Sequence, residues 1–168
     1  MALSHLMPTT GTASDEEATA EGFLRHTLEE NREVFIRVRA ASELMRMSLD
    51  VHWPFLKDRF FADRENGDCL PSHILEWFAK APPGDGPTRK LIELVNDDRY
   101  RPLWLELERP AGKKVRGGIC RRYACKALNA RIGRIVVTEE DLAALKDPEK
   151  GPARLPEILA RVRDLAKP

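Results

Sequence analysis

The sequence has little cysteine and no long hydrophobic run. Three cysteines stand among 168 residues, and an odd number at these spacings does not suggest a disulfide framework. No apolar stretch approaches the roughly 20 residues that a helix needs to cross a bilayer. Residues 1–12 contain neither Lys nor Arg, and they lack the apolar segment of a secretory signal. We therefore expect a cytoplasmic protein that does not enter a membrane.

Common sequence signatures of enzymes are also missing. The chain contains no glycine-rich phosphate loop, no G-x-G-x-x-G and no G-x-S-x-G. The acidic residues that begin at Asp63 do not form a calcium loop of the EF-hand type, because Asp68 and Ile74 stand where that loop needs glycine and glutamate. The sequence therefore does not favour an enzyme, and it predicts no cofactor.

Composition and periodicity indicate a mainly α protein. Hydrophobic residues make up 42% of the chain and charged residues 33%, which suits helices with one buried and one solvated face. We expect a disordered tail at residues 1–13 and a single helical domain at residues 14–168. This domain should be a bundle of about six helices, with or without one small β-hairpin near residues 133–137.

The longest predicted helix begins at Ser14 and ends near Leu49. Ser14 and Glu17 form the S-x-x-E pattern of a capping box. Apolar residues then recur at helical spacing, close to a heptad repeat, which would also suit pairing with a protein partner or a second copy of the chain. Further helices are predicted after Asp50, with Pro54 in the first turn, over residues 73–81, 88–95 and 119–132, after Thr138, and over residues 155–166.

The charge of the chain is unevenly distributed. Pro110–Thr138 contains eight Lys/Arg and no Asp/Glu, and the rest of the chain has 20 basic and 27 acidic residues, a net charge of −7. Within this basic segment, Pro110–Gly118 reads as a loop and residues 119–132 as an amphipathic helix. A helical projection assigns Arg121, Arg122 and Lys126 to its polar side.

The basic segment predicts a contact with the phosphate backbone of nucleic acid, because cations that neutralise phosphates release counterions. The residues predicted to bind are Lys113, Lys114, Arg116, Arg121, Arg122 and Lys126. The protein would then be a non-catalytic nucleic-acid-binding protein or a small subunit of a nucleoprotein complex, with DNA and RNA both open. A helical adaptor whose basic face binds an acidic protein is the alternative.

The sequence ARIGRIVVTEEDL, from Ala130 to Leu142, resembles the wing and following helix of excisionase-like winged helix-turn-helix domains. The paired helices of that family are absent upstream. The resemblance implies a wing-like hairpin near Gly133 and carries over no functional residue.

Two further patterns have alternative interpretations. Cys69, His73, Cys120 and Cys125 provide four possible zinc ligands at spacings near those of zinc sites, although small buried thiols are the simpler interpretation. Arg46 and His52, with five residues between them, resemble the R-x4–6-H signature of HEPN ribonucleases, which are all-helical. That resemblance implies a ribonuclease with Arg46 and His52 at the scissile RNA, although Met47 stands where the family commonly has a polar residue.

Overall fold

Helices account for most of the described chain. The computed structural model describes residues 13–66, 70–100, 121–147 and 149–166. These contain seven helices and no strand: α1 (Ala13–Glu30), α2 (Val34–Asn66), α3 (Leu70–Lys80), α4 (Asp85–Val95), α6 (Arg121–Ile132), α7 (Glu139–Ala144) and α8 (Gly151–Asp164). The predicted mainly α helical bundle is confirmed. The predicted tail lies outside the described residues, except for Ala13.

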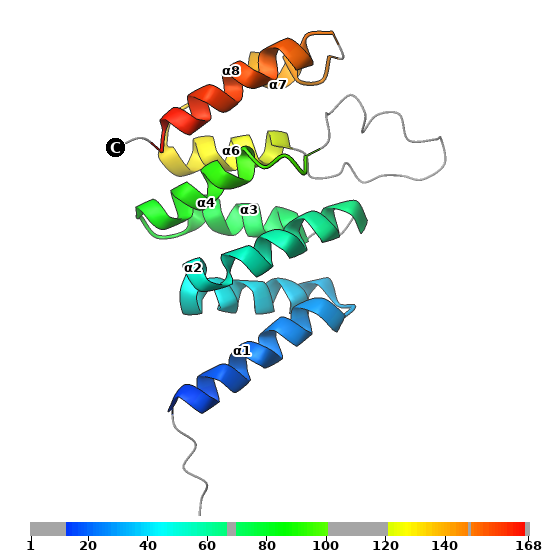
Figure 1. Ribbon diagram of the computed structural model, residues 1–168, viewed down its shortest axis with the longest axis vertical. Coiled ribbons are helices and arrows are strands. Elements are labelled where there is room, and N and C mark those ends of the chain that lie inside the picture. Colours follow the sequence, from blue (N-terminus) through cyan, green and yellow to red (C-terminus); the bar gives the residue numbers. More distant parts are fainter. Residues whose placement is uncertain (1–12, 67–69, 101–120, 148, 167–168) are drawn as a thin grey trace, which may run out of the picture.

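The helices form an elongated stack that follows the order of the chain (Figure 1). α1 lies at one end, and α7 and α8 lie at the other. α1 packs on α2, α2 on α3, and α6 packs on both α3 and α4. α8 then contacts α4 and α7. Most contacts between helices therefore join helices that are neighbours in sequence, so the fold is rich in local contacts.

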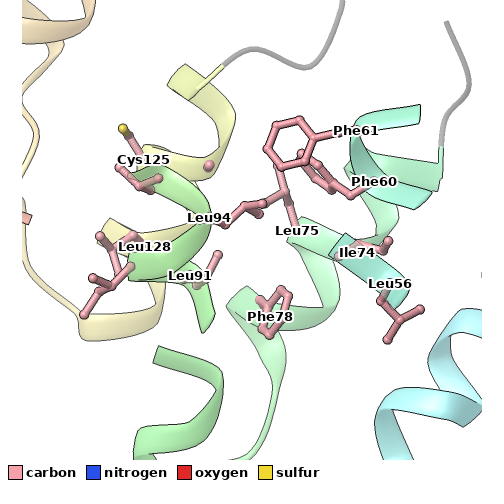
Figure 2. Packing of buried hydrophobic residues seen from close by; sticks show 14 of the residues in the cluster. Leu56, Phe60, Phe61, Ile74, Leu75, Phe78, Leu91, Leu94, Cys125 and Leu128 are labelled. Atoms are coloured by element: carbon pink, nitrogen blue, oxygen red, sulfur yellow. The ribbon is translucent and has the colours of Figure 1, made fainter. Parts of the chain in front are cut away.

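One hydrophobic core runs through the stack. It contains Leu28 of α1, Phe60 of α2, Phe78 of α3, Leu128 of α6 and Ile158 of α8, all fully buried. Figure 2 shows the central part of this core, where buried side chains of α2, α3, α4 and α6 lie between these helices. Burying each large apolar side chain contributes about 1.5–3 kcal/mol, so this continuous core stabilises the packing of the helices on one another.

The predicted helix from Ser14 to Leu49 is wrong as a single element. The chain leaves helical geometry at residues 31–33, between α1 and α2. Oδ1 of Asn31 accepts the backbone N–H of Glu33 at 2.8 Å, a side-chain turn that competes with helix continuation. The buried Arg37 then donates from Nε to the carbonyl oxygen of Leu28 at 2.9 Å, which ties the start of α2 to the end of α1.

A kink in α2 replaces the predicted boundary near Asp50. Ser48 has φ −162° and ψ 102°, an extended conformation within the helix. Pro54 follows in the second half of α2, where it cannot donate the hydrogen bond that its turn would use. The change of helix direction therefore lies two residues before the predicted cap.

The break at residues 31–33 also divides the apolar residues at near-heptad spacing that suggested pairing with another chain. Ala41 and Met45 are buried within the protein, whereas Phe23 and Phe35 are exposed. The apolar stripe therefore does not form one continuous surface for pairing, because some of its residues pack within the chain.

The hairpin considered near residues 133–137 is absent, because these residues form an irregular loop between α6 and α7. Oδ1 of Asn129 accepts the backbone N–H groups of Val136 and Val137 at 2.9 and 3.2 Å. Its Nδ2 donates to the carbonyl oxygen of Val137 at 2.8 Å. These bonds satisfy backbone groups that a hairpin would have paired across strands, so the wing-like feature implied by the resemblance is not present.

Candidate nucleic-acid interface

The structure describes part of the basic segment. Lys113, Lys114 and Arg116 lie outside the described residues, whereas α6 and the loop after it are described. Of the six residues predicted to bind, this leaves Arg121, Arg122 and Lys126. Their surroundings differ, and only two of the three face solvent.

Arg121 is buried, with 8% of its surface exposed. Its Nε donates to the carbonyl oxygen of Val95 at 2.8 Å, and an η-nitrogen donates to that of Asp97 at 2.8 Å. Burial lowers the pKa of its guanidinium. The first turn of α6 is therefore fastened to the carbonyl groups at the end of α4, and Arg121 is not available to a phosphate.

Helical spacing accounts for this placement. Arg121 precedes the buried residues Cys125 and Leu128 by four and seven positions, so the three side chains lie on one face of α6. The projection that grouped Arg121 with Arg122 and Lys126 was wrong, because it followed the charge of the side chain rather than its helical phase.

Arg121 also holds the two ends of the segment 101–120 together. Its guanidinium lies 5.1 Å from the ring centre of Tyr100, the last described residue before that segment. Tyr100 packs in turn against Phe61, with ring centres 5.0 Å apart. The residues on the two sides of this segment, Tyr100 and Arg121, therefore lie side by side at the start of α6.

Arg122 and Lys126 occupy the solvated side of α6. Their side chains are 28% and 42% exposed, and both face Glu139 at the start of α7. Nζ of Lys126 lies 3.0 Å from a carboxylate oxygen of Glu139, and an η-nitrogen of Arg122 lies 3.9 Å from the other. The hydrogen bond from Lys126 lowers the pKa of the Glu139 carboxyl. We call Arg122, Lys126 and Glu139 the α6–α7 charge cluster.

Two further cations of the basic segment, Arg131 and Arg134, differ in whether a ligand could reach them. Arg131 donates to the carbonyl oxygens of Pro82 and Gly84 at 2.5 and 3.1 Å, and also to that of Ala81. It therefore caps the end of α3 and is engaged within the fold. Arg134 is exposed in the loop after α6.

Arg46 and His52 lie on the two sides of the kink at Ser48. Arg46 is exposed and pairs with Glu43 at 3.1 Å. His52 is 2% exposed, and its Nδ1 accepts a hydrogen bond from the guanidinium of Arg25 at 3.3 Å. In this conformation RNA cannot reach the imidazole of His52. We therefore interpret His52 as a packing residue, and Arg46 and His52 do not form a ribonuclease site here.

We expect these two positions to respond differently to substitution. Arg46→Ala should change the free energy of unfolding by no more than about 0.5 kcal/mol, because the side chain is solvated. His52→Ala should lower it by about 2 kcal/mol, because it removes a buried ring and a partner of Arg25. Urea unfolding followed by circular dichroism measures both values. If His52→Ala were as stable as Arg46→Ala and removed an RNA-cleaving activity, a catalytic role would replace the packing role.

The proposed zinc ligands are only partly described. Cys69 and Cys120 lie outside the described residues. Cys125 is buried in the core, and Nδ1 of His73 lies 3.8 Å from the carboxylate of Glu76. Within the described ranges, no three His, Cys, Asp or Glu side chains gather as a metal site would require.

Asp141 forms a second polar centre that the sequence did not indicate. Its carboxylate is fully buried and accepts hydrogen bonds from Arg154 at 2.8 Å and Arg161 at 2.5 Å, both on α8. It also forms a capping box with Thr138, whose predicted capping role is confirmed. The two arginines stand 13 and 20 positions further along the chain, which is why the sequence pattern around Thr138 did not indicate them.

None of the helices in the described part of the chain is both long and apolar enough to span a bilayer. Comparison with models of protein families, with curated proteins and with solved structures found no match to this chain.

Proposed function

We propose that the protein binds nucleic acid non-catalytically, through contacts with the phosphate backbone at the solvated side of α6. The observation that carries the proposal is the contact between Arg121 and Tyr100. It fixes both ends of the segment 101–120 at the start of α6, next to the partly exposed Arg122 and the exposed Lys126. Lys113, Lys114 and Arg116 belong to this segment, and we propose that they contact the same nucleic acid.

The composition of this face favours backbone contact over base recognition. Tyr123 is the aromatic side chain exposed on α6, and this helix by itself does not provide the series of stacking surfaces with which proteins bind single-stranded nucleic acid. Lys and Arg contacts with phosphates position a protein on nucleic acid without reading its sequence. We therefore propose binding with little sequence preference, in a cytoplasmic protein or subunit.

Binding should depend steeply on salt. If Lys113, Lys114, Arg116, Arg122 and Lys126 each neutralise one phosphate, the logarithm of the affinity for duplex DNA should fall with the logarithm of salt concentration with a slope of about −4 to −5. Reversing the charges in a Lys113→Glu, Lys114→Glu, Arg116→Glu variant should abolish binding at 0.1 M salt. Fluorescence anisotropy with a labelled 20-base-pair duplex and a single strand of the same length measures both effects.

A charge-matched variant provides the control. Arg32, Arg39 and Arg46 are exposed on α2 or just before it, and α2 does not pack on α6, so their replacement by Glu changes the net charge equally at a distance from α6. This control should lose no more than a few-fold in affinity. Equal losses in the two variants, or no binding by the wild-type protein, would contradict the proposal.

A helical protein-interaction module is the second candidate function. It is favoured by Phe35, 76% exposed, and by the exposed Phe23 and Val51, all on α1 and α2. Large apolar side chains at a surface are a common feature of protein interfaces. A complex with a protein that survives nuclease digestion, and that Phe35→Ser disrupts, would support this function. Retained oligonucleotide binding by Phe35→Ser would show that the two surfaces are separate.

A further inference from the structure

We infer that Glu139 is a built-in competitor for phosphate in the α6–α7 charge cluster, so that nucleic acid must displace it to contact Lys126 and Arg122. This inference rests on the proposed function and concerns the regulation of the same surface. The carboxylate oxygens of Glu139 lie 3.0 Å from the Lys126 ammonium and 3.9 Å from the Arg122 guanidinium. A phosphate oxygen that bound these donors would occupy the same positions.

The fold holds Glu139 in this place. Before it, the side chain of Asn129 fixes the loop through bonds to the backbone of Val136 and Val137. After it, the buried carboxylate of Asp141 fixes α7 to α8 through Arg154 and Arg161. The backbone of Glu139 therefore cannot move far from α6 without breaking one of these two anchors.

Glu139 is not needed for the helix that carries it. The capping box of α7 consists of Thr138 and Asp141, with the Asp141 N–H donating to Oγ1 of Thr138 at 3.1 Å and the Thr138 N–H donating to Oδ2 of Asp141 at 3.0 Å. Glu140 also places an acidic side chain in the first turn, which satisfies the preference of a helix N-terminus for negative charge. The side chain of Glu139 is therefore not required for the cap, and it contacts Lys126 and Arg122 instead.

The competition should be weak enough for a polyanion to overcome. The Glu139 side chain is 72% exposed, so water and salt screen its attraction to Lys126. A ligand with one phosphate would gain little by replacing one carboxylate. A ligand with several phosphates also contacts other cations of the basic segment, so its displacement of Glu139 is favoured. The cluster should therefore select against small anions and for nucleic acid.

Two matched substitutions test the inference. Glu139→Gln and Glu140→Gln change adjacent residues in the same turn of α7 and alter the net charge equally, and Glu140 is exposed. Glu139→Gln should bind the 20-base-pair duplex about 3- to 10-fold more tightly than wild type at 0.05 M salt, because a competing charge at contact distance is removed. Glu140→Gln should change the affinity less than about two-fold, because the remaining effect is long-range and screened.

The expected gain in affinity of Glu139→Gln should depend on the presence of Lys126. In the Lys126→Gln background, Glu139→Gln should produce less than about a two-fold gain, which a double-mutant cycle by anisotropy would reveal. Binding by wild type with equal effects of Glu139→Gln and Glu140→Gln would overturn the inference and leave the proposed function standing. No binding by the wild type or by any variant would overturn both.

Discussion

Replacing Asp141 by asparagine should lower the free energy of unfolding by about 3 kcal/mol. The carboxylate is fully buried and accepts hydrogen bonds from Arg154, Arg161 and the backbone N–H of Thr138. Removing one partner of a buried ion pair costs about 3–5 kcal/mol. The lower end applies here, because the side chains of Arg154 and Arg161 are 39% and 42% exposed and can be hydrated. Urea unfolding monitored by circular dichroism measures the loss.

The neighbouring Glu140→Gln provides the control for this experiment. It removes the same charge from the same helix, but Glu140 is exposed, so its substitution should change the free energy of unfolding by no more than about 0.5 kcal/mol. A loss below 1 kcal/mol for Asp141→Asn would mean that the buried carboxylate contributes little beyond its desolvation cost.

The effect of Asp141→Asn should also depend on pH. Burial alone would raise the pKa of the Asp141 carboxyl, but hydrogen bonds from the Thr138 backbone and from Arg161 and Arg154 bring the pKa below its ordinary value of 3.8. The ionised form therefore stabilises the folded state fully above about pH 4, and this contribution is lost as the pH falls through the lowered pKa. The difference between wild type and Asp141→Asn should be constant from about pH 5 to 8 and shrink in stronger acid.

Arg121→Ala should destabilise the protein by about 3 kcal/mol. The buried guanidinium donates to the carbonyl oxygens of Val95 and Asp97, and a hydrogen bond to a charged group contributes about 1.5–3 kcal/mol. The substitution also removes the contact with Tyr100 that holds together the ends of the segment 101–120. Arg121→Lys should recover less than half of the loss, because one ammonium group cannot reproduce the planar fork that reaches both carbonyls.

Arg122→Ala is the matched control, one position further along α6. Its guanidinium is partly solvated and lies 3.9 Å from the carboxylate of Glu139, so the loss of stability should stay below about 1 kcal/mol. Thermal and urea unfolding of both variants should therefore separate two adjacent arginines by about 2 kcal/mol. Equal stabilities would contradict the structural role of Arg121.

This contrast affects how nucleic-acid binding should be tested. Reversing the charge of Arg121 would place a carboxylate against the carbonyl groups at the end of α4. Such a variant would lose binding because it unfolds, whatever the protein binds. The informative substitutions are those on the solvated side, Arg122 and Lys126, together with Glu139.

Local signals determined much of the secondary structure. Thr138 caps α7, the helix predicted to begin after it, because a side-chain oxygen and a backbone N–H three residues later are brought together by the first turn itself. Prolines and glycines after Ala81 separated α3 from α4 for similarly local reasons. The break at Asn31 escaped prediction because the apolar periodicity continues across it, although the side-chain bond that makes it spans only two residues.

The sequence by itself therefore determined a mainly α protein with a basic segment beside one of its helices. Periodicity, caps and composition act over a few residues, so they can be read along the chain. Only the tertiary structure decided which charges are available. Arg121 is buried against α4, Lys126 and Arg122 face Glu139, and Asp141 joins α7 to two arginines of α8. Each of these outcomes depends on residues that packing brings together from different helices, and the pattern of charges along one helix does not contain that information.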